Sequence, residues 1–193
     1  MRIAAICGLT LMMTTSAGAE EAVTWKDDVA GWYIGVDTSI ANGCFMTASY
    51  EAGTFLRVQF NPALDNFQFM VGDPKWASIE EGKLYEIEVA FGSRSPWTGE
   101  AEGVRLGSLP ALLLNVPFDE DRAATFISEL QKMQNVAIAY QGTQIANLAL
   151  SGTHAAMDEV IACQAAMGEA GESQPAATDP FAVSPPIDQD PFN

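Results

Sequence analysis

The chain contains few of the side chains that usually carry catalysis, with one histidine and three cysteines among its 193 residues. The histidine, His154, lies at the start of a predicted helix, where the dipole disfavours a protonated imidazole and would keep the ring neutral for acid–base chemistry. No Gly-x-Ser-x-Gly or similar nucleophile motif accompanies it. A surface or capping role for His154 is therefore favoured. We expect a protein without catalytic residues, metal ions or cofactors, and thus not an enzyme.

Clustered carboxylates are the second kind of candidate chemistry. Asp119, Glu120 and Asp121 offer the oxygen ligands that Ca²⁺ prefers, but they lack the spacing of a calcium-binding loop. Acidic residues at a helix start also have a simpler explanation in the positive end of the helix dipole. Glu86 and Glu88 could act together in sugar hydrolysis, although their alternate spacing is typical of the solvent face of a strand. A hydrolase of unknown substrate is therefore the last of three functional alternatives.

The N-terminus predicts a secretory signal peptide over residues 1–19. A basic Arg2 and an apolar run over residues 3–13 precede the small-residue cleavage site Ala17-Gly18-Ala19. The apolar run is too short to span a bilayer. We expect cleavage near Ala19, no stable membrane insertion, and a periplasmic (Gram-negative) or secreted mature chain.

The two cysteines that remain after cleavage, Cys44 and Cys163, predict a disulfide. Cys7 is lost with the signal peptide, and an isolated pair in an oxidising compartment is usually bridged. A bridge between such distant residues stabilises a fold by about 4–5 kcal/mol in the chain-entropy model.

The charge balance limits the possible partners. The chain has 25 acidic and 9 basic residues, a formal net charge of −16. Binding to nucleic acid needs clustered Lys and Arg, so we expect no nucleic-acid partner. The acidity favours, as an alternative function, an inhibitor of a basic enzyme such as a lysozyme.

The region 20–167 predicts a single β-rich globular domain, because apolar and polar residues alternate along most of it. Between residues 84 and 91, four large apolar residues share one face while Glu86 and Glu88 share the other. Similar short stretches, separated by Gly, Asn and Pro turn signals, predict an antiparallel sheet. We expect an α+β fold, mostly β, as an antiparallel β-sandwich or small barrel with one inserted helix and a C-terminal helix.

Two segments have helical spacing instead. The first covers residues 119–133, with Asp119 as its expected N-cap, and its apolar positions are Ala123, Phe126, Ile127, Leu130 and Met133. The second follows Leu150, and its apolar stripe consists of Ala156, Val160, Cys163 and Met167. Because Cys163 lies on this stripe and Cys44 on an early strand, the bridge is expected to pin the last helix to the start of the sheet.

Candidate binding residues lie in a loop and in the tail. Arg94 and Trp97 belong to the loop 93–99, where an exposed tryptophan is a suitable binding anchor. Residues 168–193 carry five prolines, five acids and no base, which predicts a disordered acidic tail. Within it Asp-Pro-Phe occurs twice and presents Phe181 and Phe192 on a backbone restricted by proline, as in short linear motifs.

The strand-to-helix junction over residues 147–157, Asn-Leu-Ala-Leu-Ser-Gly-Thr-His-Ala-Ala-Met, resembles the terminal motif of the invasion-associated locus B family of exported alphaproteobacterial proteins. Trp32, Cys44, Phe67-x-Phe69 and Trp76 fit the layout of such a β-rich periplasmic domain. The mid-domain cysteines usual in that family are absent from this chain. The resemblance implies an exported protein linked to host interaction or envelope function, and it implies no catalytic residues.

Together these patterns predict an exported, non-enzymatic binding or accessory protein of the cell envelope. We expect it to contact another protein, a basic one included, through loops and through the tail with its two Asp-Pro-Phe motifs. The patterns do not predict its oligomeric state.

Overall fold

A computed structural model describes residues 22–118 and 121–172 of the chain. The predicted signal peptide, Asp119, Glu120, and the tail motifs with Phe181 and Phe192 lie outside the described residues. None of the helices in the described ranges has the length and apolar character needed to cross a membrane.

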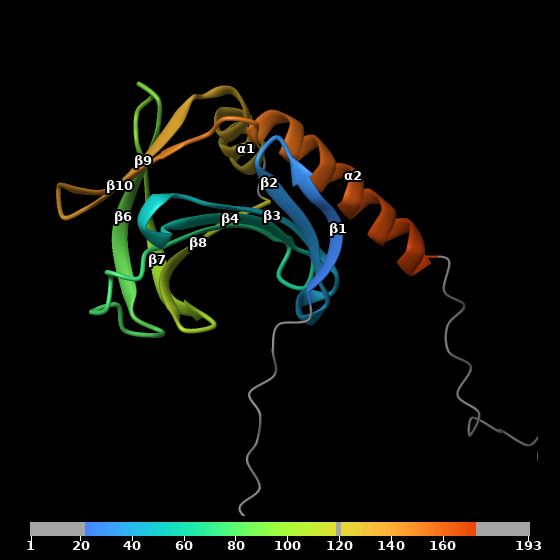
Figure 1. Cartoon of the computed structure of the whole chain (residues 1–193), viewed down its shortest axis with the longest axis horizontal. Helices are drawn as coiled ribbons and strands as arrows, with labels where there is room; N and C mark the ends of the chain where they lie inside the picture. Colours follow the sequence, from blue (N-terminus) through green and yellow to red (C-terminus); the bar gives the residue numbers. More distant parts are fainter. Residues whose placement is uncertain (1–21, 119–120, 173–193) are drawn as a thin grey trace, which may run out of the picture.

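Ten antiparallel strands form one sheet, in the order β1-β2-β3-β4-β5-β8-β7-β6-β9-β10. The sheet curves strongly and both helices lie against it (Figure 1), but it is not closed into a barrel. The predicted α+β class, mostly β and antiparallel, is confirmed. The strands are β1 (Ala22–Val29), β2 (Trp32–Asp37), β3 (Gly43–Ser49), β4 (Phe55–Asn61), β5 (Asn66–Gly72), β6 (Leu84–Phe91), β7 (Trp97–Leu106), β8 (Leu109–Pro117), β9 (Asn135–Tyr140) and β10 (Thr143–Ala149).

The core lies between one face of the sheet and the two helices, α1 (Arg122–Lys132) and α2 (Thr153–Glu172). Alternate residues of the strands point to this face, as the spacing predicts. Phe126 of α1 is fully buried at its centre. Its ring packs edge-on against four other aromatic rings, with centroids 4.9–6.2 Å away, those of Phe67, Phe69, Phe91 and Trp97.

Both predicted helices form, with differences at their ends. The N-cap position of α1 is Asp121 rather than Asp119, and its side chain makes no capping hydrogen bond. The stripe of α2 is buried as predicted at Ala156, Val160 and Cys163. The helix continues past residue 167 to Glu172, so the first five residues of the predicted disordered tail are helical although two of them are glycines.

The predicted Cys44–Cys163 disulfide is present and joins β3 to α2 across a sequence separation of 119 residues. Both cysteines are fully buried. The Cys44 backbone N–H also donates a hydrogen bond of 2.9 Å to Oε1 of Gln164. The last helix is therefore held to the early sheet by a covalent and a polar contact at one place.

The junction between β10 and α2 packs on the first hairpin of the chain. The Trp32 indole N–H donates to the Ser151 carbonyl oxygen over 2.9 Å. Gly152 has φ +80°, and a Cβ at this position would lie 2.3 Å from the carbonyl oxygen of Ala30. Only glycine fits so close to another backbone, which explains the small residue at this junction.

Tyr50, just after β3, adds a second contact to the end of β10. Its hydroxyl donates to the carbonyl oxygen of Ala149 over 2.7 Å. Burial raises the pKa of Tyr50 to about 12 from 10.0. Since the neutral phenol is favoured in the folded state, this residue stabilises the fold fully below pH 10 and loses that effect as the pH rises through about 12.

We expect a Tyr50→Phe variant to be less stable than the wild type by about 1 kcal/mol below pH 10, because it lacks the hydrogen bond. The difference should shrink as the pH rises from 10 towards 12. Urea unfolding of both proteins across this range measures it. A difference that stays constant would contradict the assignment of this pH dependence to Tyr50.

The opposite face of the sheet contains a buried ion pair that the alternation did not predict. Arg57 Nη2 lies 2.8 Å from Oδ2 of Asp37, and both side chains are only 5% exposed. The guanidinium also lies 3.8 Å from the Phe45 ring centroid, and its Nε donates to Oε1 of Gln59 over 2.8 Å. Ser39 donates to Asp37 from both its backbone N–H and its hydroxyl, so the carboxylate is held by several donors.

Candidate functional site

Trp97 is the first residue of β7 and is half-buried, so only part of its ring is available to a partner. The ring packs edge-on against Phe126, with the centroids 5.4 Å apart. The indole Nε1–H donates to Oε2 of Glu129 on α1 over 2.7 Å. The Arg122 guanidinium carbon lies 5.9 Å from the ring centroid, within range of a cation–π contact. Three contacts from α1 therefore fix the orientation of the indole.

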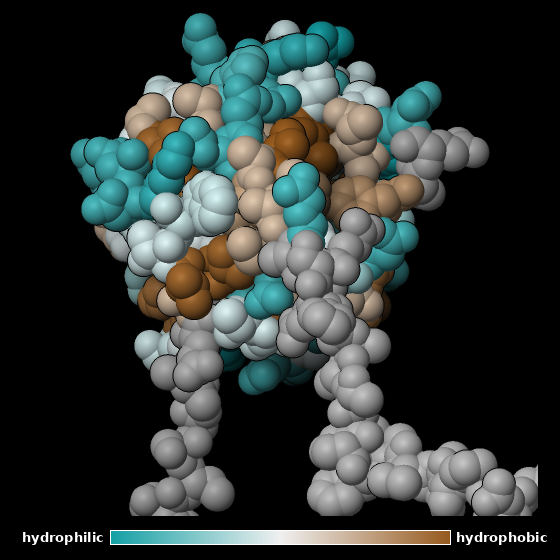
Figure 2. All heavy atoms as spheres, turned by 90° about the vertical axis from the view of Figure 1, so that its right-hand side faces the viewer, coloured by the Kyte–Doolittle hydropathy of each residue, from teal (hydrophilic) through white to brown (hydrophobic). Residues whose placement is uncertain are grey.

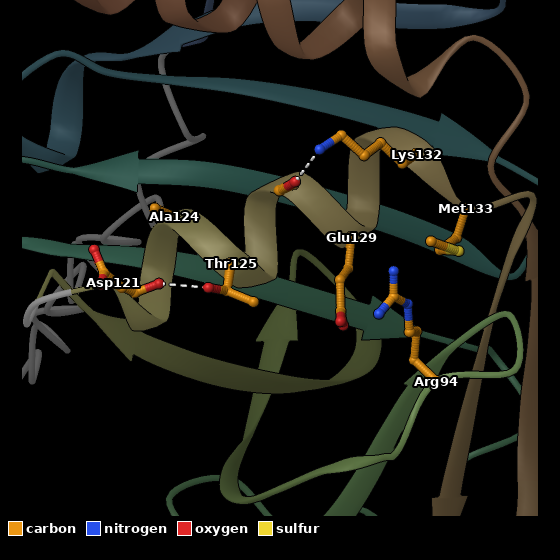
Figure 3. A pocket seen from close by; sticks show the side chains of 8 residues that line it. Arg94, Asp121, Ala124, Thr125, Glu129, Lys132 and Met133 are labelled. Carbon is orange, nitrogen blue, oxygen red and sulfur yellow. Dashed lines mark hydrogen bonds between the residues drawn. The ribbon is translucent and has the colours of Figure 1, made fainter.

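Arg94 is exposed in the turn between β6 and β7, where its backbone N–H donates to the carbonyl oxygen of Phe91. Figure 3 shows its guanidinium directed towards Glu129 and Met133 of the α1 region. These residues, with Thr125 and others of α1, line a hollow of about 430 Å³. The structure therefore places both predicted residues near Glu129, because Trp97 donates a hydrogen bond to its carboxylate and Arg94 lines the same hollow as Glu129.

A second hollow of about 270 Å³ is lined by the indole itself. Its apolar lining comes from Trp97, Phe126, Leu114, Val116 and Pro117. Arg122 and Asn115 are among its polar lining residues. We call the five residues Arg94, Trp97, Arg122, Phe126 and Glu129, with this second hollow, the Trp97 site.

The cations of this region form no ion pair with the described residues. The salt bridges within residues 22–118 and 121–172 involve other basic side chains. Lys132, beside the first hollow, donates instead to the Ser128 hydroxyl over 2.7 Å. Arg94, Arg122 and Lys132 are exposed side chains beside the two hollows, in a chain with 25 acids and 9 bases. An anionic group at this place would find aromatic rings and guanidinium groups side by side.

Glu86 and Glu88 lie on the uncovered face of β6, as the alternation predicts. Glu86 is directly opposite Glu100 of β7, and Glu102 lies on the same face. Like charges directly opposite each other destabilise a sheet. Glu86 and Glu88 also line a hollow of about 350 Å³ with Tyr140 and Thr98. This acidic face, defined by the four glutamates, would attract a cationic surface.

The remaining candidates lie apart from the Trp97 site. His154 is exposed in the first turn of α2, with Nδ1 3.1 Å from Oδ2 of Asp158. Trp32 is buried in the core, and Trp76 is half-buried. Among the described residues, no three His, Cys, Asp or Glu side chains are grouped as a metal site would need.

The side formed by β1 and α2 offers no continuous apolar face. Figure 2 shows that its apolar areas are interrupted by polar ones. Val23 and Trp25 on β1 and Ile161 on α2 are exposed there. Because scattered exposed apolar residues are usual on soluble proteins, they do not mark a binding site.

Comparison of the chain with family models, with curated proteins and with solved structures finds no match. The resemblance to the invasion-associated locus B family therefore stays a prediction from the sequence.

Proposed function

We propose that the protein is an exported, non-enzymatic binding protein of the cell envelope that contacts another protein through the Trp97 site. The observation that carries the proposal is the arrangement of the indole. Trp97 is held by Glu129 and Phe126 beside a hollow, while Arg94 and Arg122 form no ion pair with the described residues. Tryptophan and arginine are the residues most enriched among those that dominate binding energy. A fixed aromatic anchor also loses little conformational entropy when a partner binds.

Two further observations support export and a binding role. A structural disulfide between Cys44 and Cys163 is stable in an oxidising compartment. The residues 1–19 have the composition of a secretory signal. The resemblance of residues 147–157 to an exported envelope family agrees with both.

The test is capture of partners from envelope extract by the mature full-length protein, followed by purification of the captured protein and measurement of its Kd. We expect Arg94→Glu combined with Arg122→Glu to weaken the Kd at least about tenfold, or about 1.4 kcal/mol. Arg105→Glu is the matched control, because Arg105 is exposed near the opposite end of β7. Trp97→Phe keeps the packing on Phe126 but removes the indole N–H, and should weaken binding less. A Kd unchanged in both the double variant and Trp97→Phe would overturn the proposal.

The acidic face favours a second candidate, an inhibitor of a basic enzyme such as a lysozyme. Four carboxylates that destabilise their own sheet would be neutralised by a cationic partner. The same capture experiment distinguishes the two candidates. A basic enzyme that is released by moderate salt and lost in Glu86→Gln/Glu100→Gln, but kept in Arg94→Glu/Arg122→Glu, would identify the inhibitor.

A further inference from the structure

We propose that the second Asp-Pro-Phe motif, residues 190–192, docks in the Trp97 site of its own molecule. The tail would then be a tethered occupant that a partner must displace. The inference rests on the proposed function, because it assigns a ligand chemistry to the same site: an aromatic side chain next to a carboxylate.

The side chains of the motif suit the residues that line the hollow. The hollow has aromatic and aliphatic walls, formed by Trp97, Phe126 and Leu114 among others, which suit the ring of Phe192. Arg122 lines the same hollow, and a guanidinium binds a carboxylate such as that of Asp190 in a charge-assisted hydrogen bond.

The two proposed contacts, of Asp190 with Arg122 and of Phe192 with the aromatic wall, also fit the spacing of the residues in the motif. The Arg122 guanidinium carbon lies 5.9 Å from the centre of the Trp97 ring. Proline favours polyproline II backbone, in which residues two apart are separated by about 6.2 Å along the axis and their side chains diverge around it. The rotatable side chains of Asp190 and Phe192 can bridge a separation of this size, so one Asp-Pro-Phe can reach the cation and the aromatic wall together.

The length of chain beyond α2 allows the second motif to reach the site. The helices contact each other where Gln131 of α1 donates to Oδ1 of Asp158 of α2 over 3.2 Å. The path from Glu172 back along α2 and then along α1 to Arg122 is about 45 Å, at 1.5 Å per residue plus one helix diameter. Eighteen residues separate Glu172 from Asp190, and a chain of that length extends to about 60 Å. The first motif, seven residues from Glu172, extends to only about 23 Å.

Charge orients the motif within the hollow. Residues 168–193 contain five acids and no base. Arg122 of α1 and Glu100 of β7 both line the hollow, while Arg94 and Lys132 line the first hollow beside α1, so the Asp190 carboxylate is attracted to the α1 side and repelled from the β7 side. Tethering also gives the motif a local concentration at the site, which is highest when the root-mean-square length of the linker matches the span and falls as the linker must be stretched.

The test uses the mature full-length protein and a fluorescent peptide of residues 184–193 as a probe. Because the tethered copy competes, we expect the peptide to bind Phe192→Ala at least about tenfold more tightly than the wild type. Phe181→Ala is the matched control and should behave as the wild type. Arg122→Glu introduced into Phe192→Ala should abolish peptide binding, whereas Arg105→Glu in the same background should not.

Three other results of the peptide-binding experiment would contradict the proposal. Equal affinity of the peptide for wild type and Phe192→Ala would show that the tail does not occupy the site, and would overturn it. No binding to either protein would overturn it as well, and tighter binding to Phe181→Ala would overturn the assignment to the second motif. The proposed function is tested separately, since capture of a partner that depends on Arg94 and Arg122 would stand in all three cases.

Discussion

Replacement of both Cys44 and Cys163 by alanine is expected to lower the free energy of unfolding by about 4–5 kcal/mol. The bridge closes a loop with a sequence separation of 119 residues, and a cross-link over so long a loop greatly restricts the unfolded chain. Since a domain of this size is typically stable by only about 5–15 kcal/mol, the loss would be a large fraction of the total.

Urea unfolding of the double variant beside the oxidised wild type measures this effect. Wild-type protein reduced under denaturing conditions and refolded with reductant is the control, because it lacks the bridge but keeps both sulfur atoms. We expect the reduced protein to lose nearly as much stability as the double variant, since each Cys→Ala change removes only one buried sulfur. A loss below about 1 kcal/mol in both would mean that packing of α2 on β2 and β3 holds the helix without the bridge.

The disulfide was predictable because Cys7 falls in the predicted signal peptide, which leaves Cys44 and Cys163 as the one remaining pair. Most of the strands were predictable for an equally local reason, as β6 illustrates. Its Tyr85, Ile87, Val89 and Phe91 face the core, and its glutamates face solvent. In such strands the period of two directly reports which face is buried.

Three strands lacked that signal, each for a physical reason. The core-facing positions of β7 are Gly99, Ala101 and Gly103, which leave no apolar period to detect. In β8 the run Leu112–Leu114 is apolar on both faces, so the alternation disappears. β1 is exposed along nearly its whole length, and the polar run 26–28 ends the short alternation begun by Val23 and Trp25. The pairing of β5 with β8 and of β6 with β9 depends on contacts distant in sequence, which no local pattern contains.

In the Trp97 site, too, residues with a local sequence signal were predictable, and residues brought in by contacts distant in sequence were not. Arg94 and Trp97 were identifiable from their residue types in one loop. Glu129 and Arg122 were not, because their role arises only when α1 packs beside the start of β7, and Trp97 and Glu129 are 32 residues apart in the chain. A glutamate on the partly exposed side of an amphipathic helix carries no signal that would single it out.

Arg57 is buried at a position that the alternation of apolar and polar residues assigns to solvent. Its replacement is expected to have the second large effect on stability. Its position between Leu56 and Val58 indicates the solvent face of β4, yet its side chain is only 5% exposed and pairs with Asp37. We expect Arg57→Met to lower the free energy of unfolding by about 3–5 kcal/mol, because the buried Asp37 carboxylate loses its cation. The long methionine side chain keeps the contact with Phe45, so the loss reports charge rather than packing.

A double-mutant cycle separates the ion pair from its surroundings. Asp37→Asn alone should also be destabilising, because it removes the carboxylate that lies 2.8 Å from the buried Arg57 guanidinium. The combination Asp37→Asn/Arg57→Met should be more stable than the sum of the two losses, with a coupling of about 1–3 kcal/mol in urea unfolding. Additive losses would mean that the guanidinium is held mainly by Phe45 and Gln59. In that case Arg57→Lys, which keeps the charge but not the planar fork, should lose about as much as Arg57→Met.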